Sequence, residues 1–141
     1  MPKRTAEAQW NGDLKNGNGT MRLGSGSFEG MYNFGSRFEE EVGTNPDELI
    51  CAALAGCFSM ALSAGLGGAG YSPQSVQTNG ELNLEKDGDG FSIKSITLNC
   101  TADVPGISEQ DFQKQAEDAK KGCPVSRALT GVDIKLNASL K

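Results

Sequence analysis

The sequence predicts a single α+β domain in which short strands surround one long buried helix. The chain has 141 residues, a common domain length that supports a core without disulfide staples. Residues 49–62 contain no charged side chain, which is typical of a helix buried on most sides. Alternating apolar and polar segments with Asn-Gly and Asp-Gly turn signals flank this run and predict antiparallel strands. No internal linker or repeat is found, so the domain is taken as residues 1–141.

The N-terminal residues predict a small antiparallel meander. Strands are expected at residues 6–10, 20–23 and 28–33, because turn signals rich in Asn and Gly separate three short alternating runs. Residues 34–43 are interpreted as a loop that leads into the central helix. Arg37 is the only basic residue of this loop and stands among glutamates.

The central helix has clear signals at both ends. Thr44 or Asn45 can cap its first N–H groups, and Pro46 suits the first helical position. Asp47 and Glu48 place negative charge where the helix dipole favours it. The run Gly65-Leu-Gly-Gly-Ala-Gly formally matches the dinucleotide fingerprint, but that fingerprint needs a strand before it and a helix after it. Here a helix precedes it, so a glycine-terminated helix end is favoured over a nucleotide site.

The C-terminal half predicts a hairpin, two helices and a last strand. Residues 76–85 and 91–104 alternate around an Asp-Gly-Asp-Gly turn. Ser108 caps a helix that ends at Gly122, a short helix follows to Leu129, and residues 132–140 alternate again. The expected order is βββ-α-ββ-αα-β, with antiparallel sheets around the buried central helix.

Charge and composition exclude several classes of partner. Eighteen acidic and 13 basic residues give a net charge of −5, which argues against nucleic acid or an anionic membrane surface as a partner. Glycine and serine interrupt the apolar run, so we expect it to be too short and too weakly apolar to span a membrane. The N-terminus lacks the apolar region of a secretory signal, which predicts a cytoplasmic protein. Its four cysteines are then expected to be reduced, catalytic or redox-sensing.

The absence of histidine restricts the chemistry further. It removes Ser-His-Asp and Cys-His mechanisms and most catalytic zinc sites. A reactive thiolate in this chain must therefore be stabilised by arginine, lysine, helix dipoles or backbone N–H groups.

Two of the cysteines are candidates for core packing. Cys51 and Cys57 point about 120° apart on the helix and lie about 9 Å apart along its axis, so they are poor disulfide partners. Cys51 and Cys100 are interpreted as core residues. No Cys-x-x-Cys pair exists and the spacings fit no zinc site, so a metal centre is not expected.

The other two cysteines are candidates for chemistry. Cys123 stands at the N-cap of the short helix, where dipole and N–H groups lower a thiol pKa and Arg127 can add positive charge. The alternative is that Cys123 is only a small N-cap residue. Cys57, inside an apolar helix, is inert by itself because burial raises a thiol pKa. It becomes reactive only if a cation such as Arg37 reaches it.

These residues resemble the OsmC/Ohr family, the osmotically inducible protein C and organic hydroperoxide resistance proteins. The resemblance covers the whole chain and favours the OsmC branch. Its motifs are Arg37-Phe-Glu, Gly43-Thr-Asn-Pro-Asp-Glu-Leu-Ile, Cys57-Phe-Ser-Met-Ala-Leu and Ala119-Lys-Lys-Gly-Cys-Pro-Val-Ser.

The resemblance implies a thiol-dependent peroxidase without metal or cofactor that prefers organic hydroperoxides to hydrogen peroxide. It implies that Cys57 attacks the peroxide and becomes a sulfenic acid, and that Cys123 then condenses with it to a disulfide. Arg37 would stabilise the Cys57 thiolate, and Glu48 would hold the Arg37 guanidinium. A dithiol, such as a lipoylated protein, would reduce the disulfide. Plausible pocket walls, or plain core residues, are Phe34, Phe38, Phe58 and Met60.

Helix geometry adds a prediction about assembly. Glu48 and Cys57 lie about 180° apart on one helix and about 13 Å apart along it, so one helix cannot direct both at one sulfur. We expect Arg37 and Glu48 to serve Cys57 of a partner chain in an intertwined homodimer, which the resemblance also implies.

Two other functions are compatible with the residues. A non-enzymatic thiol redox sensor or binding protein on the same fold would form the Cys57–Cys123 disulfide without repeated turnover. A thiol hydrolase or acyl carrier is less favoured because the chain has no histidine base.

Overall fold

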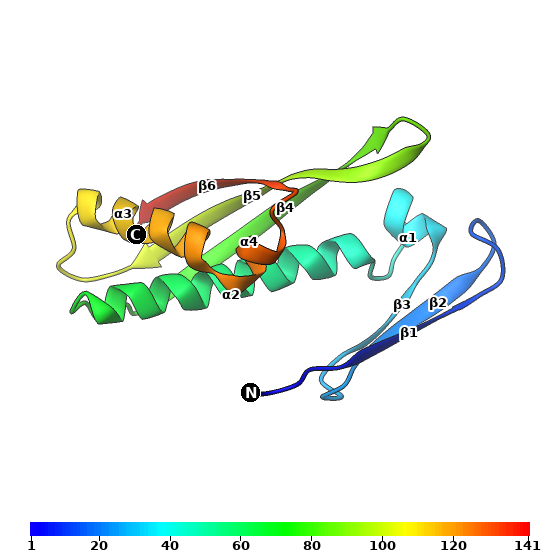
Figure 1. Cartoon of the computed structure of the whole chain (residues 1–141), viewed down its shortest axis with the longest axis horizontal. Helices are drawn as coiled ribbons and strands as arrows, with labels where there is room; N and C mark the ends of the chain where they lie inside the picture. Colours follow the sequence, from blue (N-terminus) through cyan, green and yellow to red (C-terminus); the bar gives the residue numbers. More distant parts are fainter. The chain divides into compact units, whose positions relative to one another are not determined.

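The computed structural model describes all 141 residues and divides into two compact units, residues 1–49 and 50–141. The chain order is βββ-αα-ββ-αα-β (Figure 1). The elements are β1 (Ala6–Asn11), β2 (Asn18–Leu23), β3 (Glu29–Tyr32), α1 (Phe34–Phe38), α2 (Pro46–Gly68), β4 (Ser75–Asp87), β5 (Gly90–Asp103), α3 (Glu109–Gly122), α4 (Pro124–Ala128) and β6 (Asp133–Leu140). The α+β class is confirmed, and the strands lie within two residues of their expected ends.

The N-terminal unit contains the predicted meander. Strands β1, β2 and β3 form an antiparallel sheet in that order. Gly19 of β2 lies opposite Trp10 and Tyr32, and a Cβ there would stand only 2.7 Å from the Tyr32 ring and 2.8 Å from the Trp10 ring. The glycine therefore lets the two rings approach each other, with centroids 5.3 Å apart.

The short helix α1 lies where a loop was expected. A capping box forms it: Ser36 N–H donates to Asn33 Oδ1 at 2.7 Å, and Asn33 N–H donates to Ser36 Oγ at 2.9 Å. The Ser36 hydroxyl also donates to the Thr44 carbonyl at 2.8 Å. These bonds stabilise a five-residue helix whose glycine and aromatic residues give little helix propensity by themselves.

The caps of α2 explain its length. Asn45 is the N-cap, because its Oδ1 accepts the Glu48 N–H at 2.7 Å. At the other end, Tyr71 N–H donates to the Leu66 carbonyl at 3.0 Å and Gly70 has a φ of +94°. This is a Schellman ending, which confirms that the glycine-rich run terminates a helix.

The expectation that this apolar run is too short and too weakly apolar to span a membrane is wrong. Helix α2 has 23 residues and is long and apolar enough to cross a bilayer by length and composition. Extension of the helix to Gly68 adds the turn that the sequence argument left out. The core helix of a globular domain can have the same length and composition, and α2 contributes fully buried residues to a core.

The C-terminal unit contains a three-stranded sheet with the order β4-β5-β6. Strands β4 and β5 form the predicted antiparallel hairpin. Strand β6 pairs with β5 in parallel, so the expectation of purely antiparallel sheets is wrong for this pair. The reason is topological: α3 and α4 carry the chain back along the sheet, and β6 therefore starts at the same end as β5.

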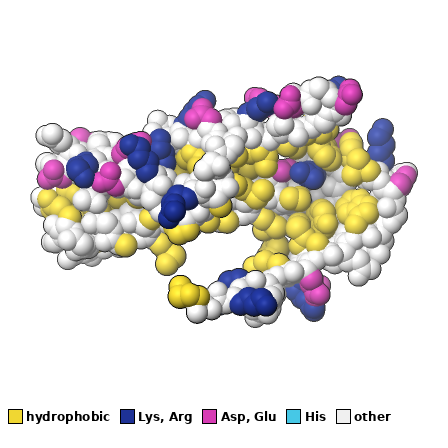
Figure 2. All heavy atoms as spheres, in the orientation of Figure 1, with side chains coloured by type: hydrophobic (Ala, Val, Ile, Leu, Met, Phe, Trp, Pro, Cys, Tyr) yellow, Lys and Arg dark blue, Asp and Glu magenta, His cyan; other side chains and the backbone are white.

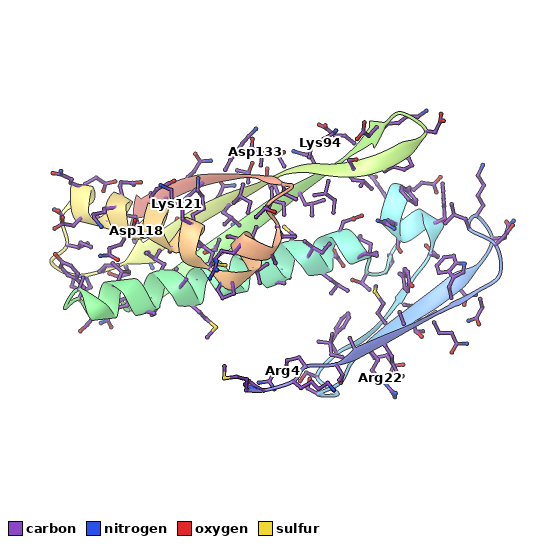
Figure 3. All side chains as sticks on the ribbon, in the orientation of Figure 1. Arg4, Arg22, Lys94, Asp118, Lys121 and Asp133 are labelled. Atoms are coloured by element: carbon purple, nitrogen blue, oxygen red, sulfur yellow. The ribbon has the colours of Figure 1, made fainter.

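One hydrophobic core joins α2, β5 and α3 in this unit. Every fourth residue of α2 is fully buried, every second residue of β5 enters the same core, and α3 adds a third stripe. The core residues of these elements are Leu54, Phe58, Leu62, Leu66, Ile96, Leu98, Cys100, Ala102, Phe112, Ala116 and Ala119. Charged residues of α3, such as Asp118 and Lys121, are exposed on its outer side (Figure 3). Helix α3 therefore packs through one face only.

Candidate active site

The fold brings Cys57 and Cys123 into contact although they lie 66 positions apart. Their Sγ atoms are 2.7 Å apart, and both are free thiols. Cys57 is in the middle of α2 and partly exposed, whereas Cys123 lies between α3 and α4 with no exposed surface. A disulfide between them needs little further movement, because an S–S bond of about 2.05 Å is only slightly shorter than this separation.

Cys123 is held by the ends of two helices. Its N–H donates to the Ala119 carbonyl at 3.0 Å, which closes α3. Its carbonyl accepts the Arg127 N–H, and its Sγ accepts the Ser126 N–H at 3.5 Å, which opens α4. The predicted N-cap position is confirmed. Pro124 follows at the first helical position, where its missing N–H is not needed.

The surroundings of the two sulfurs shift their pKa values in opposite directions and favour the thiolate at Cys123 over the thiolate at Cys57. Burial raises the pKa of Cys57, the hydrogen bond with Cys123 raises it further, and the Val125 N–H lowers it only in part. Burial also raises the pKa of Cys123, but hydrogen bonds from Cys57, from Ser126 and from the Val125 N–H outweigh it and lower the pKa overall. Arg127 is exposed and is not among these groups. Within one chain, Cys57 therefore needs a further cation to become the thiolate.

Arg37 is paired with a carboxylate in the N-terminal unit. Its Nε and Nη2 atoms donate to the two oxygens of Asp47 at 3.2 and 3.3 Å, and its guanidinium lies over the Phe38 ring. Asp47 is only 7% exposed. The expected partner, Glu48, is exposed and makes no ion pair with Arg37 in the chain. Adjacent residues of a helix point about 100° apart, so only one of these two carboxylates can face α1.

An apolar pocket opens beside Arg37. Its volume is about 420 Å³, and it is lined by Trp10, Gly12, Leu14, Tyr32, Asn33, Phe34, Arg37 and Phe38. The Phe34 and Phe38 rings, expected as pocket walls, stand 4.9 Å apart on this lining. In Figure 2, hydrophobic side chains are visible over β1–β3 and α1. The pocket combines a flat apolar lining with one guanidinium, which suits an organic group that carries a polar or anionic end.

Sequence reasoning missed part of this lining, and two of the four residues it offered as walls or core lie outside the lining. Trp10, Leu14 and Tyr32 were not expected in this lining. The available signal was the short segment between Trp10 and Gly19, which pair across β1 and β2. Phe58 is fully buried in the core and Met60 is 77% exposed, so neither is part of this lining.

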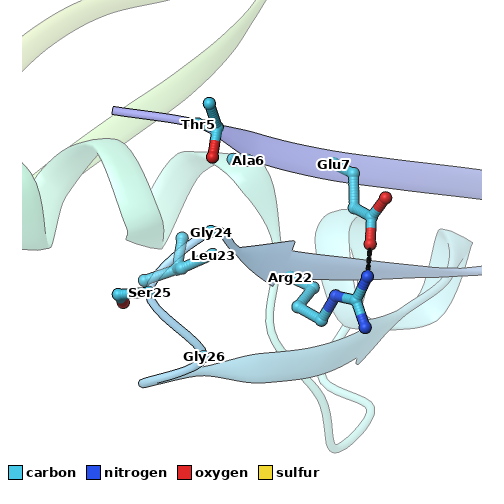
Figure 4. A pocket seen from close by; sticks show the side chains of 8 residues that line it. All are labelled: Thr5, Ala6, Glu7, Arg22, Leu23, Gly24, Ser25 and Gly26. Atoms are coloured by element: carbon cyan, nitrogen blue, oxygen red, sulfur yellow. Dashed lines mark hydrogen bonds and ion pairs between the residues drawn. The ribbon is translucent and has the colours of Figure 1, made fainter. Parts of the chain in front are cut away.

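A second hollow in the N-terminal unit lacks the features of a reactive site. It has a volume of about 410 Å³ and lies at the ends of β1 and β2, where Arg22 forms an ion pair with Glu7 (Figure 4). Its lining holds no cysteine and no aromatic ring. The only two charged side chains of the lining pair with each other.

The two remaining cysteines are packing residues, as expected. Cys100 faces the core from β5, and burial raises its pKa, partly offset by a hydrogen bond with Thr78. Cys51 lies against β4 at Gly80, where an added Cβ would stand 2.5 Å from its sulfur. Burial raises the pKa of Cys51, and the charge of Glu81 raises it further. Neither thiol is set up to act as a thiolate.

The contacts of Arg37 predict unequal roles for the two neighbouring carboxylates. Asp47→Asn should lower the free energy of unfolding by about 1–2 kcal/mol, because a charged, bidentate hydrogen bond is lost from a partly exposed arginine. The matched variant Glu48→Gln should change it by less than about 0.5 kcal/mol. Urea unfolding at one protein concentration measures both, and equal losses would contradict the pairing.

Several known proteins are similar to this chain. The model of the OsmC-like protein family matches residues 38–137, which include both Cys57 and Cys123. Peroxiredoxin OsmC of Escherichia coli (strain K12) is 46% identical over 139 residues, which cover 98% of this chain and 96% of the relative. Organic hydroperoxide resistance protein-like 2 of Staphylococcus epidermidis is 30% identical over 97 residues, or 68% of each chain.

Solved structures of similarly named proteins have a similar fold to this chain. The organic hydroperoxide resistance protein OhrB of Bacillus subtilis has a TM-score of 0.76 at 26% identity, over 96% of this chain and 98% of that one. An OsmC-like protein of unknown function from Vibrio cholerae has a TM-score of 0.78 at 17% identity, over 99% of this chain and all of that one, which shows the shared fold. Because the family model covers most of the chain and a full-length relative is closely similar, the chain belongs to the OsmC family.

Proposed function

We propose that this chain is a cysteine-based peroxidase that reduces organic hydroperoxides, and more weakly hydrogen peroxide, to alcohols or water. The observation that carries the proposal is the 2.7 Å separation of the Cys57 and Cys123 sulfurs. The membership of the OsmC family and the similarity to Peroxiredoxin OsmC support peroxidase activity. The two thiols can be oxidised together and reduced together, which is what a peroxidase with a redox-active disulfide requires.

The reaction has two oxidative steps. The Cys57 thiolate attacks one oxygen of the O–O bond, which breaks, and the other oxygen leaves with the organic group as an alcohol after it gains a proton. Cys57 is then a sulfenic acid. The Cys123 thiolate attacks this sulfur, an S–S bond forms, and hydroxide leaves and becomes water. The early attack by Cys123 protects Cys57 from further oxidation to the irreversible sulfinic acid.

The first step needs the cation that the surroundings of Cys57 lack. Arg37 fits that role, because Asp47 holds its guanidinium through two hydrogen bonds and leaves part of the side chain exposed. We propose that Arg37 serves Cys57 of a partner chain in an intertwined homodimer. The role of Glu48 at this shared site stays a prediction, since its exposed carboxylate is open to a partner.

The pocket beside Arg37 supports an organic substrate. Its aromatic and aliphatic lining can hold an alkyl or aryl group while the peroxide end remains near the guanidinium. Hydrogen peroxide has no such group and would gain nothing from the lining. A dithiol, such as a lipoylated protein, would return the disulfide to two thiols by exchange. The expected setting is the cytoplasm, where thiols are kept reduced.

Steady turnover of cumene hydroperoxide with dithiothreitol is the direct test. The wild-type chain should turn over repeatedly, Cys57→Ser should fall to the uncatalysed rate, and Cys123→Ser should oxidise once and stop. Cys51→Ser is the control and should retain the wild-type rate, because Cys51 is a packing residue. Peptide mapping of the oxidised wild type should find one Cys57–Cys123 disulfide. A single oxidation without repeated turnover would instead support a redox sensor.

The pocket predicts a substrate-dependent effect. Leu14→Ala should raise KM for cumene hydroperoxide roughly three- to tenfold, because about 1 kcal/mol of apolar contact is lost, and leave the rate with hydrogen peroxide unchanged. Leu23→Ala is a matched control, since Leu23 is also exposed in this unit but lines the other hollow. Steady-state kinetics with both peroxides measure the effect. An equal change with both substrates would exclude the pocket from substrate binding.

The shared site can be tested by mixing two inactive chains. Cys57→Ser keeps Arg37, and Arg37→Ala keeps Cys57, so a mixed dimer contains one complete site if the residues come from different chains. Random exchange should restore about a quarter of wild-type turnover, because half of the dimers are mixed and each has one working site of two. No restoration after demonstrated exchange, or a fully active monomer in sedimentation, would rule out the shared site.

A further inference from the structure

The hydroxyl of Ser126 is buried and has no partner that accounts for it. Ser126 is 8% exposed, and its buried Oγ atom makes no hydrogen bond. A buried hydroxyl without a partner is unfavourable, and alanine at the same place would avoid that penalty. The residue is therefore poorly explained by packing alone.

The position of Ser126 directs its N–H to one sulfur. Cys123 is the N-cap of α4 and Ser126 is the third residue of that helix, so the Ser126 N–H points back to Cys123 Sγ, at 3.5 Å. The hydroxyl of the same residue is buried and unpaired, and a bond from it to this sulfur would lower the pKa of the Cys123 thiol together with the N–H. The neutral thiol is a weak acceptor and leaves the hydroxyl without a proper bond, whereas a thiolate would accept it strongly.

The charge that would satisfy this hydroxyl develops in the second oxidative step. When Cys57 is a sulfenic acid, Cys123 must attack as a thiolate: its electron pair forms the S–S bond, the S–O bond of Cys57 breaks, and hydroxide leaves. The sulfur of Cys57 is reduced and that of Cys123 is oxidised. No imidazole exists to take the Cys123 proton, so fixed donors must favour its loss.

We propose that Ser126 is the positioning residue of the resolving step, and that its hydroxyl and N–H together hold the Cys123 thiolate against Cys57. The proposal rests on the proposed function for the identity of that step. It assigns Ser126 no part in the first attack on the peroxide, which belongs to Cys57.

Few charged groups compete with Ser126 at this sulfur. Cys57 is the only titratable group among those that shift the pKa of Cys123; the others are the donors of Ser126 and the Val125 N–H. Arg127, on the same helix, is exposed. The carboxylate of Glu117 on α3 is occupied by Lys120, at 3.2 Å. Removal of the hydroxyl should therefore be visible in the titration of Cys123.

The first experiment titrates Cys123 without any peroxide. In a Cys57→Ser background, the ultraviolet absorbance of the thiolate gives the pKa of Cys123 before and after Ser126→Ala. The pKa should rise by about one unit, since a hydrogen bond to a charged group is lost. Ser126→Thr keeps the hydroxyl and should restore the lower value. An unchanged pKa in Ser126→Ala would overturn the proposal.

The second experiment separates the two oxidative steps in otherwise wild-type chains. After one equivalent of cumene hydroperoxide, Ser126→Ala should form the Cys57 sulfenic acid at the wild-type rate but close the disulfide about tenfold more slowly below the pKa of Cys123. More Cys57 should then reach sulfinic acid under excess peroxide. Ser59→Ala, which removes a hydroxyl bonded to Thr78, is the control and should change neither step.

The outcomes distinguish this proposal from the function on which it rests. Equal slowing of both steps by Ser126→Ala would indicate a general structural role and overturn the proposal. A wild-type chain that forms no disulfide would overturn the proposed function instead, and the titration in the Cys57→Ser background would still decide whether Ser126 acts on Cys123.

Discussion

The contact between the Cys57 and Cys123 sulfurs depends on the core that α2 shares with β5 and α3. Phe58 is fully buried beside Cys57 in the sequence, and Ala119 enters the same core one turn before Cys123. A close-packed core allows little relative movement, so the two sulfurs are held together without a covalent bond. This arrangement removes most of the entropic barrier to disulfide formation, because the reacting atoms are already neighbours.

The same packing makes the two thiols electrostatically unequal. Cys123 stands where a helix begins and accepts the Ser126 N–H, whereas Cys57 is in mid-helix, where its own backbone N–H groups bond within the helix. Cys123 therefore has more stabilising donors inside the chain than Cys57, for which the Val125 N–H offsets the effect of burial only in part. In a protein without histidine, the side-chain cation that could stabilise the Cys57 thiolate is a guanidinium or an ammonium group.

Much of the fold followed from local sequence signals, and much of the site did not. The charge-free run 49–62, the turn glycines and the N-cap at Cys123 are local, so α2, the strands and the start of α4 were predictable. The parallel pairing of β6 depends on the path of the whole α3–α4 connection, which strand alternation does not report. Helix α1 depends on the reciprocal bonds of Asn33 and Ser36, which propensity does not include.

The choice between Asp47 and Glu48 as the partner of Arg37 shows most clearly what local sequence signals do not predict. Both carboxylates suit the first turn of α2, and both can reach a guanidinium in a bidentate manner. What decides is the rotation of α2 about its axis, and that rotation is set by Asn45, whose side chain caps Glu48 N–H and also donates to the Ser36 carbonyl at 3.0 Å. A single asparagine thus ties α1 to α2, turns Asp47 toward Arg37 and leaves Glu48 in solvent.

The residues of the proposed site are divided between the two units of the chain, and local hydrogen bonds position those of the first unit. The guanidinium, its carboxylate and the aromatic pocket all belong to residues 1–49, and each is positioned by short-range bonds within that unit. The two sulfurs and the donors on Cys123 all belong to residues 50–141. Under the proposed mechanism, neither unit can complete a turnover alone, because one supplies the charge and the substrate lining and the other supplies the electrons. In this proposal, the N-terminal unit of one chain would activate the thiol pair that the C-terminal unit of its partner already holds together.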